Sequence, residues 1–296
     1  MTVARLLVAV LFAARLTAQT PASIQNPGGL RLLVADQNAD PALRIVLPGS
    51  PESDRSIEVL FPEHVTAVRR GNDVGEQLYL FRPGPAGQRP AWRRSGNSLE
   101  YEKGLGSGVH MLARATLEDD GVRFHYEFRN RSDIAYDMVT AVTDPRLTAM
   151  FHDVRLERTY VHHSSGFALL AAETPTRLTM RLDQWLPSRY LASFTWPVPA
   201  QLVERRADGI TYYNKSRPVD EPFLATMSAD GKWVVASFAR ETGNVWSNPE
   251  LTCQHVDPQA TLPARGDAVL EIKILVLAGS LNDALRKVRE QRAGLR

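Results

Sequence analysis

The chain of 296 residues contains a single cysteine, Cys253, so it cannot form an internal disulfide bond. A protein of this length does not need one, because it is long enough to bury a large apolar core. Hydrophobic residues make up 44% of the sequence, which is ordinary for a globular protein and excludes a disordered chain. We expect Cys253 to be a small buried apolar residue rather than a reactive thiol.

The sequence has no excess of charge, with 35 Lys and Arg residues against 33 Asp and Glu residues. Two of the arginines, Arg5 and Arg15, lie in a segment that we expect to be removed, which leaves 33 basic against 33 acidic residues. This balance and the lack of a basic block predict no nucleic-acid partner and no binding to an anionic membrane surface.

Long hydrophobic runs are also missing, because the apolar stretch Leu6–Ala14 is too short to span a bilayer. A short basic start precedes this stretch, and small residues followed by a polar segment come after it, as in a secretory signal peptide. We therefore predict a signal peptide over residues 1–18, a flexible leader over residues 19–29, and export to the periplasm or the extracellular space. The alternative is an N-terminal helix that belongs to the fold.

The motifs of several large enzyme classes are absent. We find no dinucleotide fingerprint, no Walker motif, no Gly-x-Ser-x-Gly elbow and no His-Glu-x-x-His helix. The glycine-rich segment Gly104–Gly108 lacks the lysine of a phosphate loop and is interpreted as a flexible turn. These absences argue against the commoner nucleotide-dependent enzymes, hydrolases and proteases, and we expect no cofactor.

Short runs rich in Leu, Val and Ile, separated by turn-forming residues, fill most of the chain. This pattern predicts an all-β fold, a large antiparallel β-sandwich that forms a single domain over residues 30–296. The strands expected outside the hairpin described next are Leu30–Ala35, Leu43–Leu47, Ser56–Phe61, Val65–Arg69, Leu78–Phe81, Met138–Thr143, Arg158–His163, Phe167–Ala171, Thr176–Leu182, Gln201–Arg205, Ile210–Asn214, Phe223–Ser228, Trp233–Phe238 and Ala268–Leu277.

The clearest hairpin covers Met111–Asn130, where aromatic and charged residues alternate with a period of two. We place its turn at Asp120-Gly121, which pairs Leu117 with Phe124 on the apolar face. One helix is expected, over residues 280–291, capped by Ser280. Its apolar face comprises Leu281, Ala284, Leu285 and Val288.

The segment from Cys253 to Asp257 is the first candidate site. In an extended segment Cys253, His255 and Asp257 share one face, and their side chains are all transition-metal ligands. The spacing matches no zinc finger and shows no fourth ligand, so we expect no metal ion, and metal binding by these three residues is the alternative. His255 and Asp257 are also candidates for general acid–base catalysis.

Three further residues are candidates for acid–base chemistry. His162 and His163 are neighbours on a strand and point to opposite faces, so we consider His163 alone, as an acid or base facing a cleft. His125 and Glu127 share one strand face and could act together on a small substrate. The alternative for this pair is an open sheet face on which Glu127 pairs with Arg114.

Tryptophans in loop-like surroundings form the last candidate set. Trp185, Trp196 and Trp246 have polar neighbours, and an indole ring beside planar polar groups suits the apolar face and the hydroxyl groups of a pyranose. We take Trp185, Trp246 and Asn248 as candidate substrate-binding residues. The alternative is that these rings close the ends of the sandwich core.

The series of strands, with Gly121–Asn130 running into Arg131-Ser132-Asp133, resembles the galactose-mutarotase-like β-supersandwich superfamily. The segments Trp246–Pro249 and Cys253–Pro258 resemble the end of bacterial secreted proteins of that type. The resemblance covers roughly residues 43–277 and implies the fold of a superfamily that contains aldose epimerases, accessory domains of glycan lyases and hydrolases, and proteins without known activity. The epimerase motif with the catalytic histidine is not recognisable, so no catalytic residue is carried over.

Three hypotheses of function follow. The leading one is an exported, cofactor-free supersandwich that recognises carbohydrate. The second is a sugar epimerase, mutarotase or lyase-like enzyme that uses a histidine and a carboxylate as acid and base. The third is a non-catalytic envelope module that binds another protein through a sheet face. The cleft of the leading hypothesis would be lined by Trp185, Trp246, Asn248, His163, His255 and Asp257.

Overall fold

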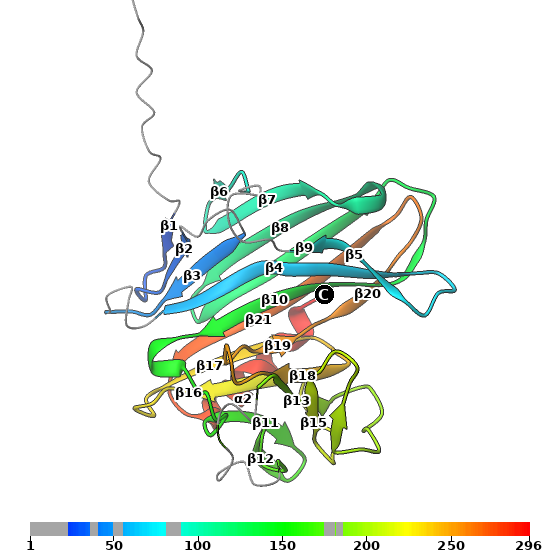
Figure 1. Cartoon of the computed structure of the whole chain (residues 1–296). Coiled ribbons are helices and arrows are strands. Elements are labelled where there is room, and N and C mark those ends of the chain that lie inside the picture. Colours follow the sequence, from blue (N-terminus) through cyan, green and yellow to red (C-terminus); the bar gives the residue numbers. More distant parts are fainter. Residues whose placement is uncertain (1–22, 36–40, 50–55, 81–89, 175–180, 182–185) are drawn as a thin grey trace, which may run out of the picture.

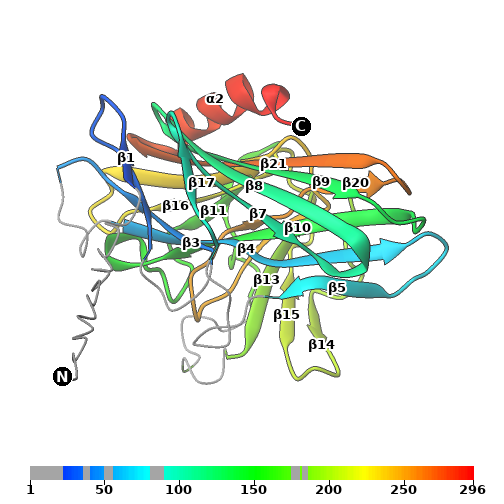
Figure 2. The ribbon, with the colours of Figure 1, turned by 90° about the horizontal axis from the view of Figure 1, so that it is seen from above.

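The computed structural model describes residues 23–35, 41–49, 56–80, 90–174, 181 and 186–296. Two large β-sheets pack face to face, a C-terminal helix covers the outer face of one of them, and a smaller sheet lies at one side (Figures 1 and 2). The prediction of an all-β sandwich with one C-terminal helix is confirmed for this part of the chain. The expected signal peptide and most of the expected strand Thr176–Leu182 lie outside the described residues.

The first large sheet has seven strands in the order β1-β2-β3-β4-β10-β20, and β5 also pairs with β4. The strands of this sheet are β1 (Ser23–Gln25), β2 (Arg31–Val34), β3 (Ala42–Val46), β4 (Ser56–Arg69), β5 (Gly75–Leu80), β10 (Tyr136–Leu147) and β20 (Gln259–Leu262). Residues 23–25, which we expected in the flexible leader, form strand β1 and bury Ile24.

The second large sheet has nine strands in the order β12-β11-β16-β17-β21-β9-β8-β7-β6. The strands of this sheet are β6 (Arg93–Ser95), β7 (Ser98–Gly104), β8 (Val109–Glu118), β9 (Gly121–Asn130), β11 (Thr159–His163), β12 (Gly166–Leu169), β16 (Phe223–Met227), β17 (Trp233–Ala239) and β21 (Asp267–Ala278).

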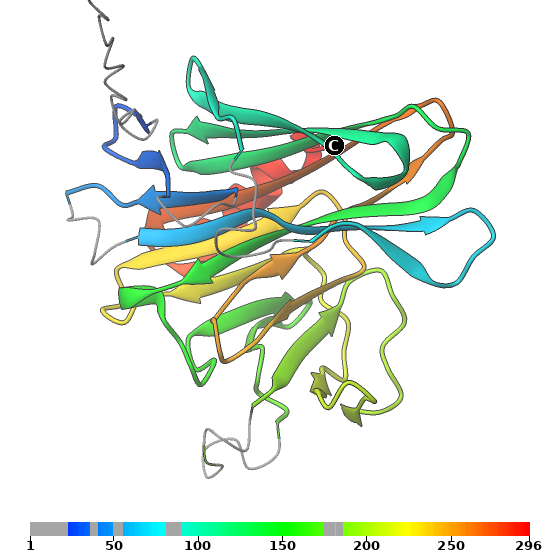
Figure 3. The same ribbon diagram turned by 45° about the horizontal axis from the view of Figure 1, so that its top comes forward.

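The third sheet has five strands in the order β14-β15-β13-β18-β19, and only its β13–β15 pair is parallel. Figure 3 shows this sheet beside the β11–β12 hairpin, below the two large sheets. The strands of this sheet are β13 (Ser188–Ser193), β14 (Val203–Arg205), β15 (Thr211–Asn214), β18 (Asn244–Ser247) and β19 (His255–Val256).

The main core lies between the two large sheets. Alternate residues of β9 and β21 point into it, as the period-two pattern predicts, and meet apolar side chains of β4 and β10. Phe61 of β4 contacts Phe124 of β9 with the ring centroids 4.9 Å apart and tilted by 66°. Other members of this core include Ile57, Val59, Val65, Met111, Ala113, Ala115, Tyr126, Phe128, Val139, Ala141, Ile272 and Ile274.

The β8–β9 hairpin is confirmed, but the predicted register is wrong by two residues. Leu117 pairs with Val122 rather than Phe124, so the turn is Asp119-Asp120 and Gly121 is already in the strand. The reason lies in the neighbouring strand, because a Cβ at residue 121 would lie 2.1 Å from the carbonyl oxygen of Ile274. The glycine is needed for this close approach to β21 and not for the turn itself.

The two strands expected at Ser56–Phe61 and Val65–Arg69 are one strand, β4. A bulge joins the two halves, because Leu60 pairs with Asp144 and His64 pairs with Val142 of β10. Three residues of β4, 61–63, therefore lie opposite the single residue Thr143 of β10. Bulges of this kind change the direction in which neighbouring side chains point.

The helix α2 (Leu281–Gln291) begins and ends where the sequence predicts. Ser280 and Asp283 form the expected capping box, with both side chain-to-backbone hydrogen bonds present. Its buried residues pack against β16, β17 and β21 in a second apolar cluster. The short 3₁₀ helices are η1 (Gly106–Gly108), η2 (Ala149–Phe151) and η3 (Arg292–Gly294). Within the described ranges, no helix has the length and apolar character required to cross a membrane.

Candidate functional site

The segment Cys253–Asp257 crosses between the small sheet and the two large ones. His255 pairs with Trp246 of β18, and Cys253 forms a bridge with Arg146 of β10. Gln254 points the other way and bonds the nine-stranded sheet: its amide donates to Thr226 Oγ1 at 2.9 Å and its carbonyl accepts from Ser237 N at 3.1 Å. This anchoring directs the odd-numbered residues of the segment toward β10.

Strand β10 supplies a residue that the sequence analysis missed. Thr143 points into the main core, where its hydroxyl bonds Tyr126 Oη at 2.6 Å. The next residue, Asp144, points out of the opposite face of the same strand and is 1% exposed, because residues 253–258 cover it. The sequence signal that could have identified Asp144 is the presence of an acidic residue among the apolar residues of a strand.

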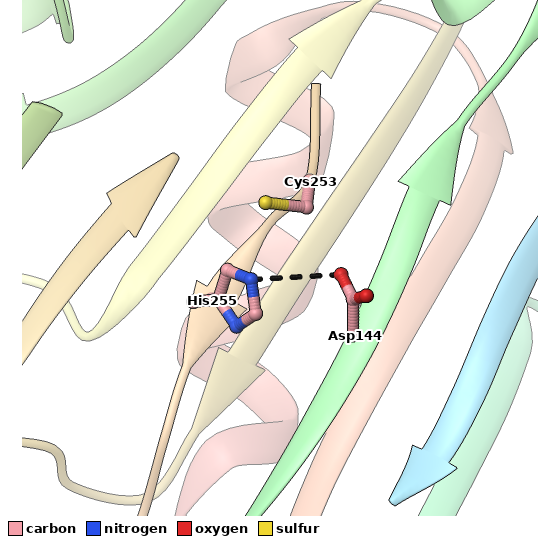
Figure 4. Close-up of side chains that lie close together, drawn as sticks. All are labelled: Asp144, Cys253 and His255. Atoms are coloured by element: carbon pink, nitrogen blue, oxygen red, sulfur yellow. Dashed lines mark ion pairs between the residues drawn. The ribbon is translucent and has the colours of Figure 1, made fainter. Parts of the chain in front are cut away.

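Asp144, Cys253 and His255 converge on one point (Figure 4). Each offers one ligand atom, and these atoms all lie within 4.8 Å of one another. Asp144 Oδ1 lies 3.5 Å from His255 Nε2, and Asp257 Oδ1 lies 3.8 Å from His255 Nδ1. The expected common face of Cys253, His255 and Asp257 therefore exists, and Asp144 completes it from a second strand.

Trp246 holds the His255 ring in place. The two rings are stacked with their centroids 3.7 Å apart and an angle of 4° between their planes. Trp246 Nε1 also donates to Asp257 Oδ2 at 3.2 Å, and the guanidinium of Arg189 lies 5.8 Å from the Trp246 ring. His255 thus covers one face of the indole that we expected to stack on a sugar.

Two further side chains orient the cluster. Arg146 Nε donates to Asp144 Oδ2 at 2.7 Å, and this leaves Asp144 Oδ1 facing His255. Asn248, expected to contact substrate, is buried and donates through Nδ2 to Cys253 Sγ at 2.9 Å. Both contacts fix the direction of a side chain in the cluster.

Among the described residues, three buried polar atoms of this cluster have no hydrogen-bond partner: Asp144 Oδ1, His255 Nδ1 and Asp257 Oδ1. Asp144 Oδ1 lies 3.5 Å from His255 Nε2, and Asp257 Oδ1 lies 3.8 Å from His255 Nδ1; both distances exceed the usual length of a hydrogen bond. Since the great majority of buried polar atoms in proteins are partnered, three unpartnered atoms in one place indicate a site for another group.

The protonation of the cluster follows from its burial. Burial raises the pKa of the Cys253 thiol and also that of the Asp144 carboxyl. Burial opposes charge on His255, yet the adjacent Cys253 sulfur and the Asp257 carboxylate hold the pKa of the imidazole well above its usual value. Burial thus favours the neutral forms of Cys253 and Asp144, whereas the neighbours of His255 favour its charged form.

His163, another residue predicted to line the cleft, lies elsewhere. His163 is buried in β11, where its Nδ1 bonds the carbonyl oxygen of Pro218 at 2.8 Å, and burial lowers its pKa. It contributes no atom to the Asp144–Cys253–His255 cluster. Trp185 lies outside the described residues.

His125 and Glu127 do share a face of β9, but each has another partner. His125 Nδ1 lies 2.9 Å from Glu271 Oε1, and Glu127 Oε1 accepts from Arg129 Nε at 2.7 Å. The expected cross-strand pair with Arg114 is not formed, because Arg114 bonds Glu100 on β7 at 2.7 Å. This face therefore pairs His125 with Glu271, and it does not bring His125 and Glu127 together as an acid and a base.

The sequence matches no protein-family model and no curated protein. Solved structures are similar to it in fold. The Slr1438 protein of Synechocystis has a TM-score of 0.50 at 8% identity, over 88% of this chain and 96% of that chain.

A galactose mutarotase related enzyme of Lactobacillus acidophilus has a TM-score of 0.49 at 10% identity, over 88% of this chain and 99% of that chain. A galactose mutarotase-like protein of Lactobacillus casei has a TM-score of 0.46 at 10% identity, over 87% of this chain and all of that chain. Galactose mutarotase-like proteins are among the solved structures found to be similar to this chain. At these identities the likeness concerns the fold alone.

Proposed function

We propose that the protein binds carbohydrate at the partly exposed end of the His255 cluster, and that it does so after export. The observation that carries this proposal is the pair of unpartnered atoms His255 Nδ1 and Asp257 Oδ1, 3.8 Å apart. A sugar hydroxyl both donates and accepts, so one hydroxyl satisfies a ring nitrogen and a carboxylate oxygen together. Both atoms are buried, but the Asp257 side chain that carries one of them is 16% exposed, so this is the end of the cluster nearest to solvent.

A second aromatic ring supports the proposal. Trp196 is 48% exposed and lies directly on Gly243, where a Cβ would come within 2.0 Å of its Cε2 atom. The backbone of Thr242, next to Gly243, accepts a hydrogen bond from Thr195, and the Thr242 hydroxyl donates to the carbonyl oxygen of Asp257 at 3.2 Å. Backbone contacts thus link the segment of this exposed indole to Asp257, and such an indole offers a pyranose an apolar surface.

Trp246 has a different role in this proposal from the one that its sequence context indicates. Because His255 covers one face of its indole and Arg189 approaches the ring, Trp246 positions the polar pair instead of stacking on the ligand. Its Nε1 donor fixes Asp257 Oδ2 and leaves Oδ1 to accept a hydroxyl.

The test is a glycan-array screen of the full-length protein, followed by calorimetric titration with the glycan that binds. We expect Trp196→Ala, Trp246→Ala and His255→Ala each to weaken binding by about tenfold or more, since a contact of about 1.4 kcal/mol changes a dissociation constant tenfold. Leu80→Ala is the matched control, because Leu80 is 44% exposed on β5, outside the site. A folded protein that binds no glycan contradicts the proposal, as does unchanged binding by both Trp246→Ala and His255→Ala.

The same samples distinguish binding from catalysis. Incubation with aldoses and uronates, followed by NMR of the sugar, shows whether anomers or epimers exchange faster than in buffer. Exchange above background that disappears in His255→Ala would make the protein an enzyme acting on the sugar that it binds. Binding without exchange leaves it a recognition protein.

A further inference from the structure

The Asp144–Cys253–His255 cluster unites three different metal-binding groups in a buried place. The three residues are 1%, 0% and 2% exposed, and their ligand atoms lie within 4.8 Å of one another. In the part of the chain that the structure describes, Asp144 Oδ1 has no hydrogen-bond partner, although it points straight at the His255 ring. A buried carboxylate oxygen without a partner is costly unless a cation or a donor completes it.

Each of the three groups also has the outer partner that a metal ligand requires. Arg146 holds Asp144 through Oδ2 and leaves Oδ1 free for an ion. Asn248 donates to the sulfur of Cys253, which is the direction of hydrogen bond that stabilises a thiolate. Metal-bound histidines usually give their second ring N–H to a carboxylate, and Asp257 faces Nδ1 of His255 in that position.

The donor set selects the class of metal. A thiolate and an imidazole favour zinc-like transition metals, whereas magnesium and calcium prefer sites made of oxygen atoms only. One thiolate, one carboxylate and a neutral imidazole balance the two charges of Zn²⁺. Three protein ligands leave the fourth tetrahedral position for a water molecule or for an oxygen atom of a ligand.

We propose that Asp144 Oδ1, Cys253 Sγ and His255 Nε2 bind one zinc ion. On binding, a zinc–sulfur bond forms, the S–H bond of Cys253 breaks and its proton passes to solvent, while His255 binds through Nε2 as the neutral ring. The ring keeps its N–H at Nδ1, which faces the carboxylate of Asp257. This inference goes beyond carbohydrate binding and holds whatever ligand takes the fourth position.

The experiment is a titration of the chelator-treated, full-length protein with Co²⁺ in the absence of sugar. Cobalt in such a site gives a sulfur-to-cobalt charge-transfer band in the near ultraviolet and intense d–d bands in the visible region. We expect both to saturate at one ion per chain and to disappear on addition of Zn²⁺, which binds more tightly than Co²⁺.

Variants assign the ligands. Cys253→Ser should lose the charge-transfer band, and Asp144→Asn should bind Co²⁺ far more weakly. Asp257→Asn changes an outer partner only, so it should retain the band and weaken the affinity by about 10- to 100-fold. His163→Gln is the matched control, since it alters another buried histidine away from the cluster and should leave the titration unchanged. Circular dichroism establishes that each variant is folded.

The inference is overturned if the folded wild-type protein shows no cobalt bands, or if Asp144→Asn and Cys253→Ser both give the wild-type titration. If a variant of a zinc ligand fails to fold, two measurements still test the zinc site. They are the stoichiometry of the wild-type protein and the affinity of Asp257→Asn, whose side chain is partly exposed. Cobalt bands in a protein that binds no glycan refute the carbohydrate proposal and leave the zinc site standing. Glycan binding without cobalt bands does the reverse.

Discussion

Thr143 and Asp144 are neighbours on β10, and they point into two regions that treat buried polar atoms in opposite ways. Thr143 faces the core between the large sheets, where its hydroxyl is bonded to Tyr126 at 2.6 Å. Asp144 faces the segment 253–257, where, among the residues described, its Oδ1 atom finds no hydrogen-bond partner. One strand thus separates a core in which Thr143 and Tyr126 partner each other from a cluster that is short of partners.

If our proposals hold, the difference separates residues that stabilise the fold from residues that bind a ligand. A core gains free energy by close packing and by satisfying each polar atom. A binding site keeps atoms unsatisfied until a ligand arrives, and the rest of the fold supplies the stability that this costs. Substitutions in the two regions should therefore differ in kind: those in the core change stability, and those in the cluster change binding.

The largest effect on stability is expected from Phe124→Ala in the main core. Phe124 is fully buried and contacts Phe61, so its removal should lower the free energy of unfolding by about 3–5 kcal/mol. Urea unfolding measures the change, and the protein that stays folded should still give the cobalt titration of the wild type. A loss of metal binding in folded Phe124→Ala would show that the two regions are not separate.

Lys273 is a buried charge with three hydrogen-bond partners, and it provides a second contrast to the cluster. Lys273 is 2% exposed, and its Nζ donates to Glu118, Asp120 and Gln291, each at 2.6 Å. Lys273→Met should lower the free energy of unfolding by about 3 kcal/mol, because two carboxylates lose their cation. It should leave glycan and metal binding intact. If the substitution is neutral by urea unfolding, partnered charges do not stabilise this fold.

The same group of charges predicts how stability depends on pH. Burial alone would raise the pKa of Asp120, but the hydrogen bonds from Lys273 and Gln291 outweigh it and lower the pKa below its ordinary value. A carboxyl with a lowered pKa adds stability above its unfolded pKa of about 4, and that stability is lost as the pH falls through the folded pKa.

Urea unfolding at a series of pH values tests this dependence. The free energy of unfolding should fall as the pH drops below about 4, and the fall should be smaller in Asp120→Asn, which has no carboxyl to protonate. Asp133→Asn is a suitable control, since the pKa of Asp133 is also lowered by an arginine but the pair lies exposed on the surface. Identical pH profiles for wild type and Asp120→Asn would contradict the prediction.

Zinc should stabilise the protein through the cluster alone. At a free zinc concentration of 100 times its dissociation constant, the gain in the free energy of unfolding is about 2.7 kcal/mol, provided that the unfolded chain does not bind the ion. Thermal unfolding with zinc and with a chelator measures it. Cys253→Ser should show no gain, and an equal gain in both proteins would place the ion elsewhere.

The smallest change in stability is expected from Asp144→Asn. Burial already disfavours the charge of this side chain, so loss of the charge should change the free energy of unfolding of the metal-free protein by less than about 1 kcal/mol. The same substitution should abolish tight metal binding. A destabilisation as large as that of Phe124→Ala would mean that Asp144 belongs to the core.

The sequence predicts most strands and the helix because their signals are local. Alternation along β9 and the capping pair of Ser280 and Asp283 depend only on neighbouring residues. The hairpin register depends on a distant strand, since Gly121 is required by the approach of Ile274 and not by the turn. That requirement cannot be read from the hairpin alone.

In the candidate site too, the features that depend on neighbouring residues are predicted, and those that depend on distant strands are not. Alternation places Cys253, His255 and Asp257 on one face, and the sequence predicts this correctly. The stack of Trp246 on His255 depends on the pairing of β18 with β19. Both strands are too short to show a periodic pattern from which this pairing could be predicted. Asp144 joins the cluster only because β10 passes beneath the segment, and no local pattern encodes that crossing.

Gln254 connects the cluster to a backbone amide of the nine-stranded sheet, where binding can be measured. Its carboxamide accepts the backbone N–H of Ser237, in the middle of β17, and donates to the carbonyl oxygen of Val235. Deuterium replaces the amide hydrogen of Ser237 only when this contact opens. A ligand that immobilises His255, the next residue, also holds Gln254 closed, so occupancy of the cluster should slow hydrogen exchange at an amide inside the nine-stranded sheet.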